Sequence, residues 1–264
     1  LVLCSLVCGS MAIGDTKKLG TVGVRTLLFY LVTTALAVTV AITIGNIINS
    51  RILLMGEDGQ VRYSESILFT NCTVTGNGKW AAVYDVGGKE IYVLDTQGEV
   101  YRLTLDGDIL AAALNPGGYL TVTVNTSGYK ASVEVYDPKG EKVFAFHSGD
   151  QFLMTAAVSA DSRQMAAVTM GQEDGSFVSS LALYRLGREE PYAECLLPEN
   201  AVVYDLGTVG GSYCAVTETG LQLVTTSGKL AGSYSYDGGY LHRCSLGGDG
   251  YAALLLGRYK SGSQ

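Results

Sequence analysis

The sequence has few of the residues on which common catalytic and cofactor sites depend. Its 264 residues contain one tryptophan, two histidines and four prolines, and only 16% are charged. Walker, Rossmann and zinc signatures are absent. The six cysteines form no C-x-x-C pair and have no histidine at ligand spacing: Cys4, Cys8, Cys72, Cys195, Cys214 and Cys244. We therefore expect no catalysis and no cofactor, while a disulfide among the last four cysteines stays open.

Charge is divided unevenly along the chain. Residues 1–51 contain Lys17, Lys18, Arg25 and Arg51 against Asp15, a net charge of +3. The whole chain has a net charge of −7, so the remainder has a net charge of −10. An acidic remainder argues against nucleic acid or an anionic lipid surface as a partner.

A long uncharged stretch predicts a membrane span. Residues 26–50 contain 25 residues without a charge, and as a helix at about 1.5 Å per residue they exceed the ~30 Å hydrocarbon core of a bilayer. The basic residues before this stretch place the N-terminus in the cytoplasm and residues 51–264 outside. A signal peptide cleaved after residues 35–37 is the alternative, but the apolar run continues too far beyond that point.

Residues 1–14, LVLCSLVCGSMAIG, predict the end of a truncated apolar helix, and a polar connection follows. Residues 1–49 resemble the sodium:dicarboxylate (glutamate/aspartate) symporter family, in the region from the end of its second membrane helix to its third helix. Two motifs carry the resemblance, GD-x-KKLG in the loop and R-x-LLFYLVTTALAV in the following helix. The resemblance implies sodium ligands at Tyr30, Thr33 and Thr34, which share one helical face. The family's substrate hairpins have no counterpart here. We therefore expect these hydroxyls to bond to carbonyls one turn earlier rather than to hold sodium.

A repeated β pattern begins after Ser50. Short runs rich in Val, Ile, Tyr and Thr alternate with Gly, Asp and Asn turns, which is typical of strands. Five strand–turn–strand segments align, and their turn residues are 40, 45, 48 and 39 positions apart: Gly78, Gly118, Arg163, Gly211 and Gly250. A third strand and a hairpin-linked fourth follow in four of these units. A four-stranded repeat of this length predicts WD40-like propeller blades; a β-sandwich is the alternative.

Small residues recur six positions before the turns and suit strands crowded near a propeller axis: Cys72, Ala112, Ala157 and Cys244. Asp205 occupies the same position in the fourth unit, where it either lines a ligand channel or is a satisfied core or turn carboxylate. The fifth unit has two strands. We expect truncation, although residues 52–55 and 60–63 could supply the other two strands as a closing hairpin.

The stretch SRILLMGEDGQVRYSESILF leads into the first unit. Residues 51–264 are similar to a bacterial family of unknown function in which one membrane helix precedes an extracytoplasmic propeller-like domain. We therefore expect a mainly β chain with a partial propeller of four to five blades over 51–264, preceded by the membrane segment 1–50.

The expected function is a membrane-anchored extracytoplasmic scaffold that binds an envelope protein or a small ligand without catalysis. One alternative is a sodium-coupled dicarboxylate or amino-acid symporter fragment fused to an unrelated domain. Another is a propeller enzyme, but quinoprotein propellers need repeated tryptophans and glycosidase propellers need paired carboxylates. The two histidines, His147 and His242, stand alone in the sequence and are expected on the surface or in the core.

Overall fold

The computed structural model describes residues 29, 33–34, 50–173, 176–197, 202–246 and 250–258. The chain divides into two compact units, Leu1–Ser50 and Arg51–Gln264. The predicted apolar helix end at residues 1–14 lies outside the described residues, as does nearly all of the predicted span at 26–50. Within that span, Phe29, Thr33 and Thr34 are helical. No helix in the described ranges has the length and apolar character needed to cross a bilayer.

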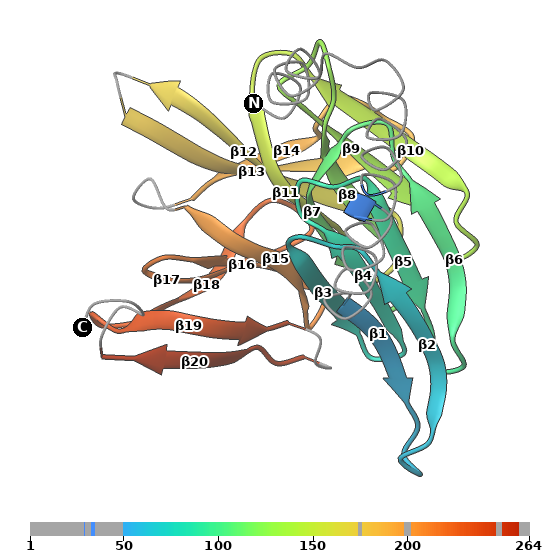
Figure 1. The fold of residues 1–264 in the computed structure, drawn as a ribbon. Coiled ribbons are helices and arrows are strands. Elements are labelled where there is room, and N and C mark those ends of the chain that lie inside the picture. The colour runs from blue at the N-terminus through green and yellow to red at the C-terminus, as the bar shows by residue number, and fades with distance from the viewer. Residues whose placement is uncertain are drawn as a thin grey trace, which may run out of the picture. The chain divides into compact units, whose positions relative to one another are not determined.

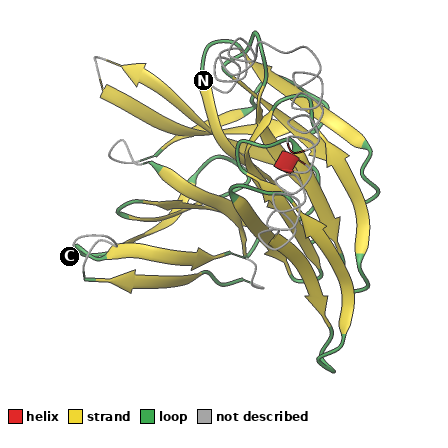
Figure 2. Ribbon diagram, viewed as in Figure 1, coloured by secondary structure: helices red, strands yellow, loops and turns green. Residues whose placement is uncertain are grey.

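The second unit is built from antiparallel sheets whose strands follow one another in sequence (Figures 1 and 2). Four sheets of the described part have four strands each, and we call them blades A to D. Blade A contains β3 (Cys72–Asn77), β4 (Trp80–Asp85), β5 (Glu90–Leu94) and β6 (Glu99–Thr104). Blade B contains β7 (Asp108–Leu114), β8 (Leu120–Asn125), β9 (Ala131–Tyr136) and β10 (Lys142–Ser148).

The later blades repeat this order. Blade C contains β11 (Phe152–Val158), β12 (Gln164–Glu173), β13 (Ser176–Arg185) and β14 (Ala193–Leu196). Blade D contains β15 (Val203–Val209), β16 (Ser212–Thr217), β17 (Gly220–Val224) and β18 (Leu230–Ser235). Two further sheets have two strands: the first hairpin, β1 (Ser50–Met55) with β2 (Val61–Ile67), and the last hairpin, β19 (Tyr240–Ser245) with β20 (Ala253–Gly257).

A recurrent turn joins the third strand of a blade to the fourth. In blade B the N–H of Asp137 donates to the carbonyl of Glu141 at 2.9 Å, and the N–H of Gly140 donates to the carbonyl of Asp137 at 3.0 Å. Gly140 has φ 84°, a conformation that glycine adopts without steric cost. Thr225, Gly228 and Lys229 of blade D form the same two bonds. Asp137 in blade B and Thr225 in blade D thus hold equivalent positions at the start of the turn, and Gly140 and Gly228 hold the left-handed position.

The first strand of most blades contains a register shift against the second strand. The shifts fall at Leu110 in β7, Met154 in β11 and Tyr204 in β15, and the last hairpin has the same shift at His242 in β19. The corresponding pair in blade A is regular. An extra residue of this kind bends a strand and increases its twist, which changes the direction of the side chains that follow.

The hydrophobic core consists of layers between consecutive sheets. Ile91 of blade A and Leu120 of blade B lie in one cluster, and both side chains are completely buried. Further clusters lie between blades B and C, between C and D, between the first hairpin and blade A, and between blade D and the last hairpin. Because the inner blades are covered on both faces, β9 is buried along its whole length. Sheets stacked side by side in this way are propeller blades.

The predicted fold class, a mainly β partial propeller of four to five blades, is confirmed for residues 50–258. Four of the five repeats are complete blades, and the fifth is the two-stranded last hairpin. Arg163 lies in the turn between β11 and β12, as expected, and the residue before it, Ser162, takes the left-handed conformation with φ 58°. The reason is local, since Ser159 opens a turn in which its carbonyl accepts from the N–H of Ser162 at 3.0 Å.

Candidate functional site

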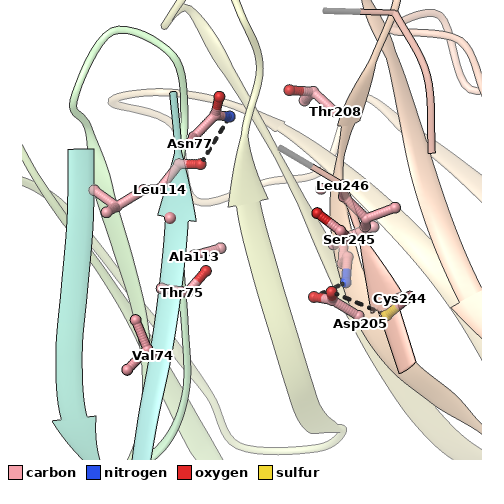
Figure 3. A pocket seen from close by; sticks show the side chains of 13 residues that line it. Val74, Thr75, Asn77, Ala113, Leu114, Asp205, Thr208, Cys244, Ser245 and Leu246 are labelled. Carbon is pink, nitrogen blue, oxygen red and sulfur yellow. Dashed lines mark hydrogen bonds between the residues drawn. The ribbon is translucent and has the colours of Figure 1, made fainter. Parts of the chain in front are cut away.

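The first strands of three blades and of the last hairpin meet around a cavity of about 170 Å³. One wall comes from β3 and β7, and the opposite wall from β15 and β19 (Figure 3). The side chains that bring polar atoms to the lining are Thr75, Asn77, Asp205, Thr208, Cys244 and Ser245. Because these strands are the first of their sheets, the cavity lies where the blades converge, which is where propellers have their central channel.

The β3–β7 wall is fixed by a bond across the interface between blades A and B. The side-chain amide of Asn77 donates to the carbonyl of Leu114 at 3.3 Å, as Figure 3 shows. Asn77 also pairs with Trp80 where β3 turns into β4. This wall is therefore positioned by backbone pairing and by one side-chain bond between blades.

Asp205 is the acidic group of the cavity. It follows the register shift at Tyr204 in β15. Its Oδ1 accepts from the N–H of Leu206 at 2.9 Å, and its Oδ2 accepts from the Cys244 thiol at 3.5 Å (Figure 3). Burial raises the pKa of Asp205, and these two bonds offset only part of that rise. Within the described part of the chain, the ion pairs involve Glu65, Glu99 and Glu134 but not Asp205.

The thiols beside Asp205 are not activated. Burial raises the pKa of Cys244 to about 12, and the neighbouring Asp205 carboxylate adds to the rise. The pKa of Cys214, which is fully buried on β16, is also raised to about 12, mainly by burial. Thiolate is the nucleophilic form of cysteine. Neither thiol is therefore ionised near neutral pH, and the cavity has the chemistry of a binding site with one carboxyl group.

The partly buried carboxyl of Asp205 gives a pH-dependent prediction for stability. A raised folded-state pKa contributes stability that is fully present below about pH 3.9, the unfolded value, and is lost as the pH rises through the folded value. Asp205→Asn removes this ionisation, so we expect the variant to gain stability relative to wild type as the pH is raised across that window. Urea unfolding of the full chain from about pH 4 to pH 8 measures the difference. A stability difference between variant and wild type that does not change with pH would contradict a raised pKa of Asp205 in the folded protein.

The comparison of variant with wild type is necessary because other groups have the opposite effect. Bonds from Arg102 and Tyr63 lower the pKa of Glu99, and a bond from Ser159 lowers that of Asp161. Their stabilising contributions are lost as the pH falls. These contributions are shared by wild type and variant and cancel in the difference.

The predicted sodium ligands lie in the first unit. Tyr30 lies outside the described residues. The hydroxyl of Thr33 donates to the carbonyl of Phe29 at 3.0 Å, one turn earlier in the helix, as expected for a threonine in a helix interior. Thr34 is helical and exposed. The sodium site thus stays a prediction from family resemblance.

His147, on β10, is exposed, as expected for a surface residue, and it contacts two side chains. Its Nδ1 lies 2.6 Å from the hydroxyl of Ser132, and its ring stacks on Tyr129 with centroids 4.8 Å apart. A serine–histidine contact is the geometry of a hydrolytic dyad, but Ser132 is completely buried. A substrate cannot reach that hydroxyl, so the pair links β9 to β10. His242 is exposed on β19.

Sequence reasoning found part of the cavity and missed the rest. The repeat alignment singled out Asp205 and Cys244, which line it together. It did not single out Asn77 or Ser245. Their signal was present, because both are polar residues at the last position of a first strand. Among the described residues, no group of three or more His, Cys, Asp or Glu side chains is arranged to hold a metal ion.

Two solved structures are similar to this chain at low sequence identity. A protein of unknown function from Bacteroides caccae is 13% identical, and the match covers 62% of this chain and 60% of that protein with a TM-score of 0.42. A crystal structure of BBS1N in complex with ARL6DN, soaked with lead, is 15% identical, and the match covers 75% of this chain and 65% of that protein with a TM-score of 0.47. This chain thus spans less than two thirds of either protein's length. No match was found among curated proteins.

Two family models match different parts of the sequence. Residues 1–71 match the sodium:dicarboxylate symporter family, as the sequence predicted, and this similarity to membrane transporters favours a membrane association of that segment. Residues 43–231 match the family of unknown function DUF5711. This range includes the first hairpin, blades A to C, and blade D up to the start of β18. That match covers most of the chain, and the protein therefore belongs to the DUF5711 family.

Proposed function

We propose that this protein is a membrane-anchored binding module whose propeller lies outside the cytoplasm and takes a small ligand in its axial cavity. The observation that carries the proposal is the cavity at the convergence of the blades, with the partly buried carboxyl of Asp205 on its wall and no basic side chain among the lining residues that the structure describes. The basic residues Lys17, Lys18 and Arg25 before the predicted span support a cytoplasmic N-terminus.

The size of the cavity favours a small ligand over a large cofactor. Its volume of about 170 Å³ corresponds to about five or six water molecules at roughly 30 Å³ each. Pockets for drug-sized molecules and cofactors are larger, at roughly 300–1,000 Å³. A short, flexible molecule of a few heavy atoms fits this space.

The charge of the cavity favours a cationic ligand. Asp205 has only a backbone N–H and a weakly donating thiol as partners. An ammonium group would supply the opposite charge that a buried carboxylate needs. The acidic remainder of the chain, at −10 beyond residue 51, would also attract cations toward the domain. We infer that the ligand carries an amine, with hydroxyl and amide groups such as Thr75 and Asn77 contributing hydrogen bonds.

The module is proposed to act without catalysis. The cavity thiol of Cys244 and the neighbouring buried thiol of Cys214 are held protonated near neutral pH, and the Ser132–His147 contact is closed to substrate. These features support binding without a nucleophile in the regions the structure describes.

A fusion of alkaline phosphatase after Gln264 tests the proposed location of the propeller. Alkaline phosphatase is active only outside the cytoplasm, so we expect an active fusion. An inactive but intact fusion would contradict the extracytoplasmic location.

A diamine and its neutral counterpart test the ligand class. Titration calorimetry of the full chain in detergent would compare putrescine with the diol of the same carbon skeleton. We expect putrescine to bind at least about tenfold more tightly, since an ion pair with a desolvated carboxylate is worth more than a neutral hydrogen bond. Binding should strengthen as the pH rises through the pKa of Asp205, because the ionised carboxylate is the binding form.

Asp205→Asn is the matched variant for this experiment. The variant keeps the size of the side chain and the oxygen that accepts from the N–H of Leu206, but it removes the charge. The preference for the diamine over the diol, and the pH dependence of diamine binding, should therefore both disappear. Equal binding of diamine and diol by wild type, or an unchanged preference in the variant, would exclude the proposed site.

A further inference from the structure

The first hairpin has the features of the outer half of a blade. The N–H of Gly56 donates to the carbonyl of Gln60, and the N–H of Gly59 donates to the carbonyl of Gly56, both at 2.9 Å. Gly59 has φ 74°. These two bonds, with the same spacing, join the third and fourth strands of blades B and D, and they also join the first and second strands of blade B. The place in the chain decides between the two: β2 leads directly into β3, the first strand of blade A, as the fourth strand β6 leads into β7. The strands β1 and β2 therefore correspond to a third and a fourth strand.

The last hairpin has the features of the inner half of a blade. Its first strand, β19, carries the register shift at His242 that the first strands of blades B, C and D carry. Gly250 in its turn has φ 85°, as Gly118 has 82° in the first turn of blade B. Residues of β19 line the axial cavity with those of β3, β7 and β15. The strands β19 and β20 therefore correspond to a first and a second strand.

We propose that β20 and β1 pair with each other, so that the two hairpins form a fifth blade in the order β19-β20-β1-β2 and close the propeller within one chain. In the structure they are separate sheets, and β1 pairs with β2 while β20 pairs with β19 (Figure 1). The residues that the two strands would bring together follow from the register of the other blades.

The complete blades define that register. In blade B, Ala111 is the first residue after the register shift; it pairs with Thr123 of the second strand, and Thr123 pairs with Val133 of the third strand. Val133 lies four residues before Asp137, whose carbonyl accepts the N–H of Gly140 in the next turn and which we call the turn acceptor. Blades C and D follow the same rule through pairs that end at Leu181 and Leu221, with turn acceptors Arg185 and Thr225.

Applied to the two hairpins, the rule gives one register. Arg243 pairs with Leu255 after the shift, and the turn acceptor of the first hairpin is Gly56. Four residues before Gly56 is Ile52, so Leu255 lies opposite Ile52, and Ala253 lies opposite Leu54. Because β1 follows β20 antiparallel, every other pair in the two strands is then determined.

The faces of the two strands agree with this register. Leu181 and Leu221, at the equivalent position in blades C and D, both pack toward the following sheet. Ile52 already packs against blade A, which is the sheet that follows a fifth blade around the axis. A one-residue slip would reverse the faces. The register was derived from hydrogen bonds and shifts alone, so the position of Ile52 is an independent check.

Closure also accounts for the exposed apolar residues on both hairpins. Leu53 is 52% exposed, Met55 59% and Leu255 60%. In the derived register Leu255 shares the face of Ile52, toward blade A. Leu53 shares the face of Leu254, which packs against blade D. Pairing therefore covers these side chains and removes two free sheet edges, which otherwise invite association between chains.

Disulfide cross-linking of the full chain tests the pairing. Ala253→Cys with Leu54→Cys places two cysteines opposite each other, away from Cys244, which faces Leu254 on the other side of the sheet. After mild oxidation, we expect peptide mass spectrometry to find a link between positions 54 and 253 in a monomer. The matched control, Ala253→Cys with Leu53→Cys, places the second thiol on the opposite face, and its yield should be at least about tenfold lower because disulfide geometry is restrictive.

Each other outcome overturns the proposal. A 54–253 link found only in dimers would show that a second copy supplies the pairing strand. Equal yields in both double variants would show that no register is fixed.

Amide hydrogen exchange of the wild-type chain gives a test that needs no variant. Closure predicts that the amides of β1 and β20 that do not bond to β2 or β19 exchange at least about tenfold more slowly than amides of exposed turns, since pairing of the two strands places them in a ladder. Unprotected edges on both strands would exclude closure. Protection of β20 alone would show that another segment pairs with β20, and this result would also exclude closure by β1.

Discussion

Gly118→Ala is expected to lower the free energy of unfolding of the full chain by about 3 kcal/mol. Gly118 has φ 82°, and a Cβ at this position would lie 2.4 Å from the Cε2 atom of Trp80. The left-handed conformation costs a residue with a Cβ roughly 1–2 kcal/mol, and the overlap with a packed ring adds roughly 1–3 kcal/mol. Trp80 packs against the cluster between blades A and B, so it cannot move without disturbing that layer.

Gly128→Ala is the matched control. Gly128 also has positive φ, 90°, but no atom lies within 4 Å of a Cβ built there. It should lose only the conformational part, about 1 kcal/mol. Urea unfolding followed by circular dichroism measures both variants without relying on Trp80 fluorescence. Equal losses in the two variants would show that the first turn of blade B is not packed against Trp80.

Leu183→Ala is expected to cost about 3 kcal/mol, within the range of roughly 2–5 kcal/mol for deletion of a buried leucine side chain. Leu183 on β13 is fully buried between blades C and D, in the cluster that contains Leu206 and Tyr213. Substitution leaves a cavity between two sheets that backbone pairing holds in place, so the site cannot collapse to fill it.

Leu196→Ala, in the same blade, gives the comparison. Leu196 ends β14, pairs with Ser180 and is 69% exposed. Its loss should stay below about 0.5 kcal/mol. Thermal and urea unfolding of the two full-length variants would establish the difference, and similar losses at the two positions would contradict the layered core between blades C and D.

Local signals in the sequence predicted the blades well. The third strand of blade A runs over Glu90–Leu94, as its pattern of β-branched and aromatic residues indicated. Turn glycines such as Gly118 and Gly250 mark positions where only a residue without a Cβ is free of strain. Signals of this kind depend on a few neighbouring residues, and they recur in each unit. In blade C the left-handed residue of this turn is Ser162 rather than a glycine, and side-chain and backbone bonds within the loop hold the turn.

The cavity was harder to predict because its walls come from strands far apart in sequence. Asp205 was found since it interrupts a series of small residues. Asn77 is a polar residue at the end of a first strand, but its place in the cavity wall depends on a bond to Leu114 in another blade. The contact between Ser132 and His147 depends on the register of β9 against β10, which shifts at Lys142–Phe144. Pairing registers and packing between blades are long-range properties that residue patterns do not specify.

The sequential order of the strands has a consequence for how the domain is made. Within each complete blade, neighbouring strands in the sheet are also neighbours in sequence, so each hairpin requires only a short loop to close. A blade can form as soon as its own residues are available, and the preceding blade offers an apolar face on which it can dock. We expect assembly to proceed from one blade to the next as the chain emerges during synthesis, with the last hairpin acquiring its neighbours at the end.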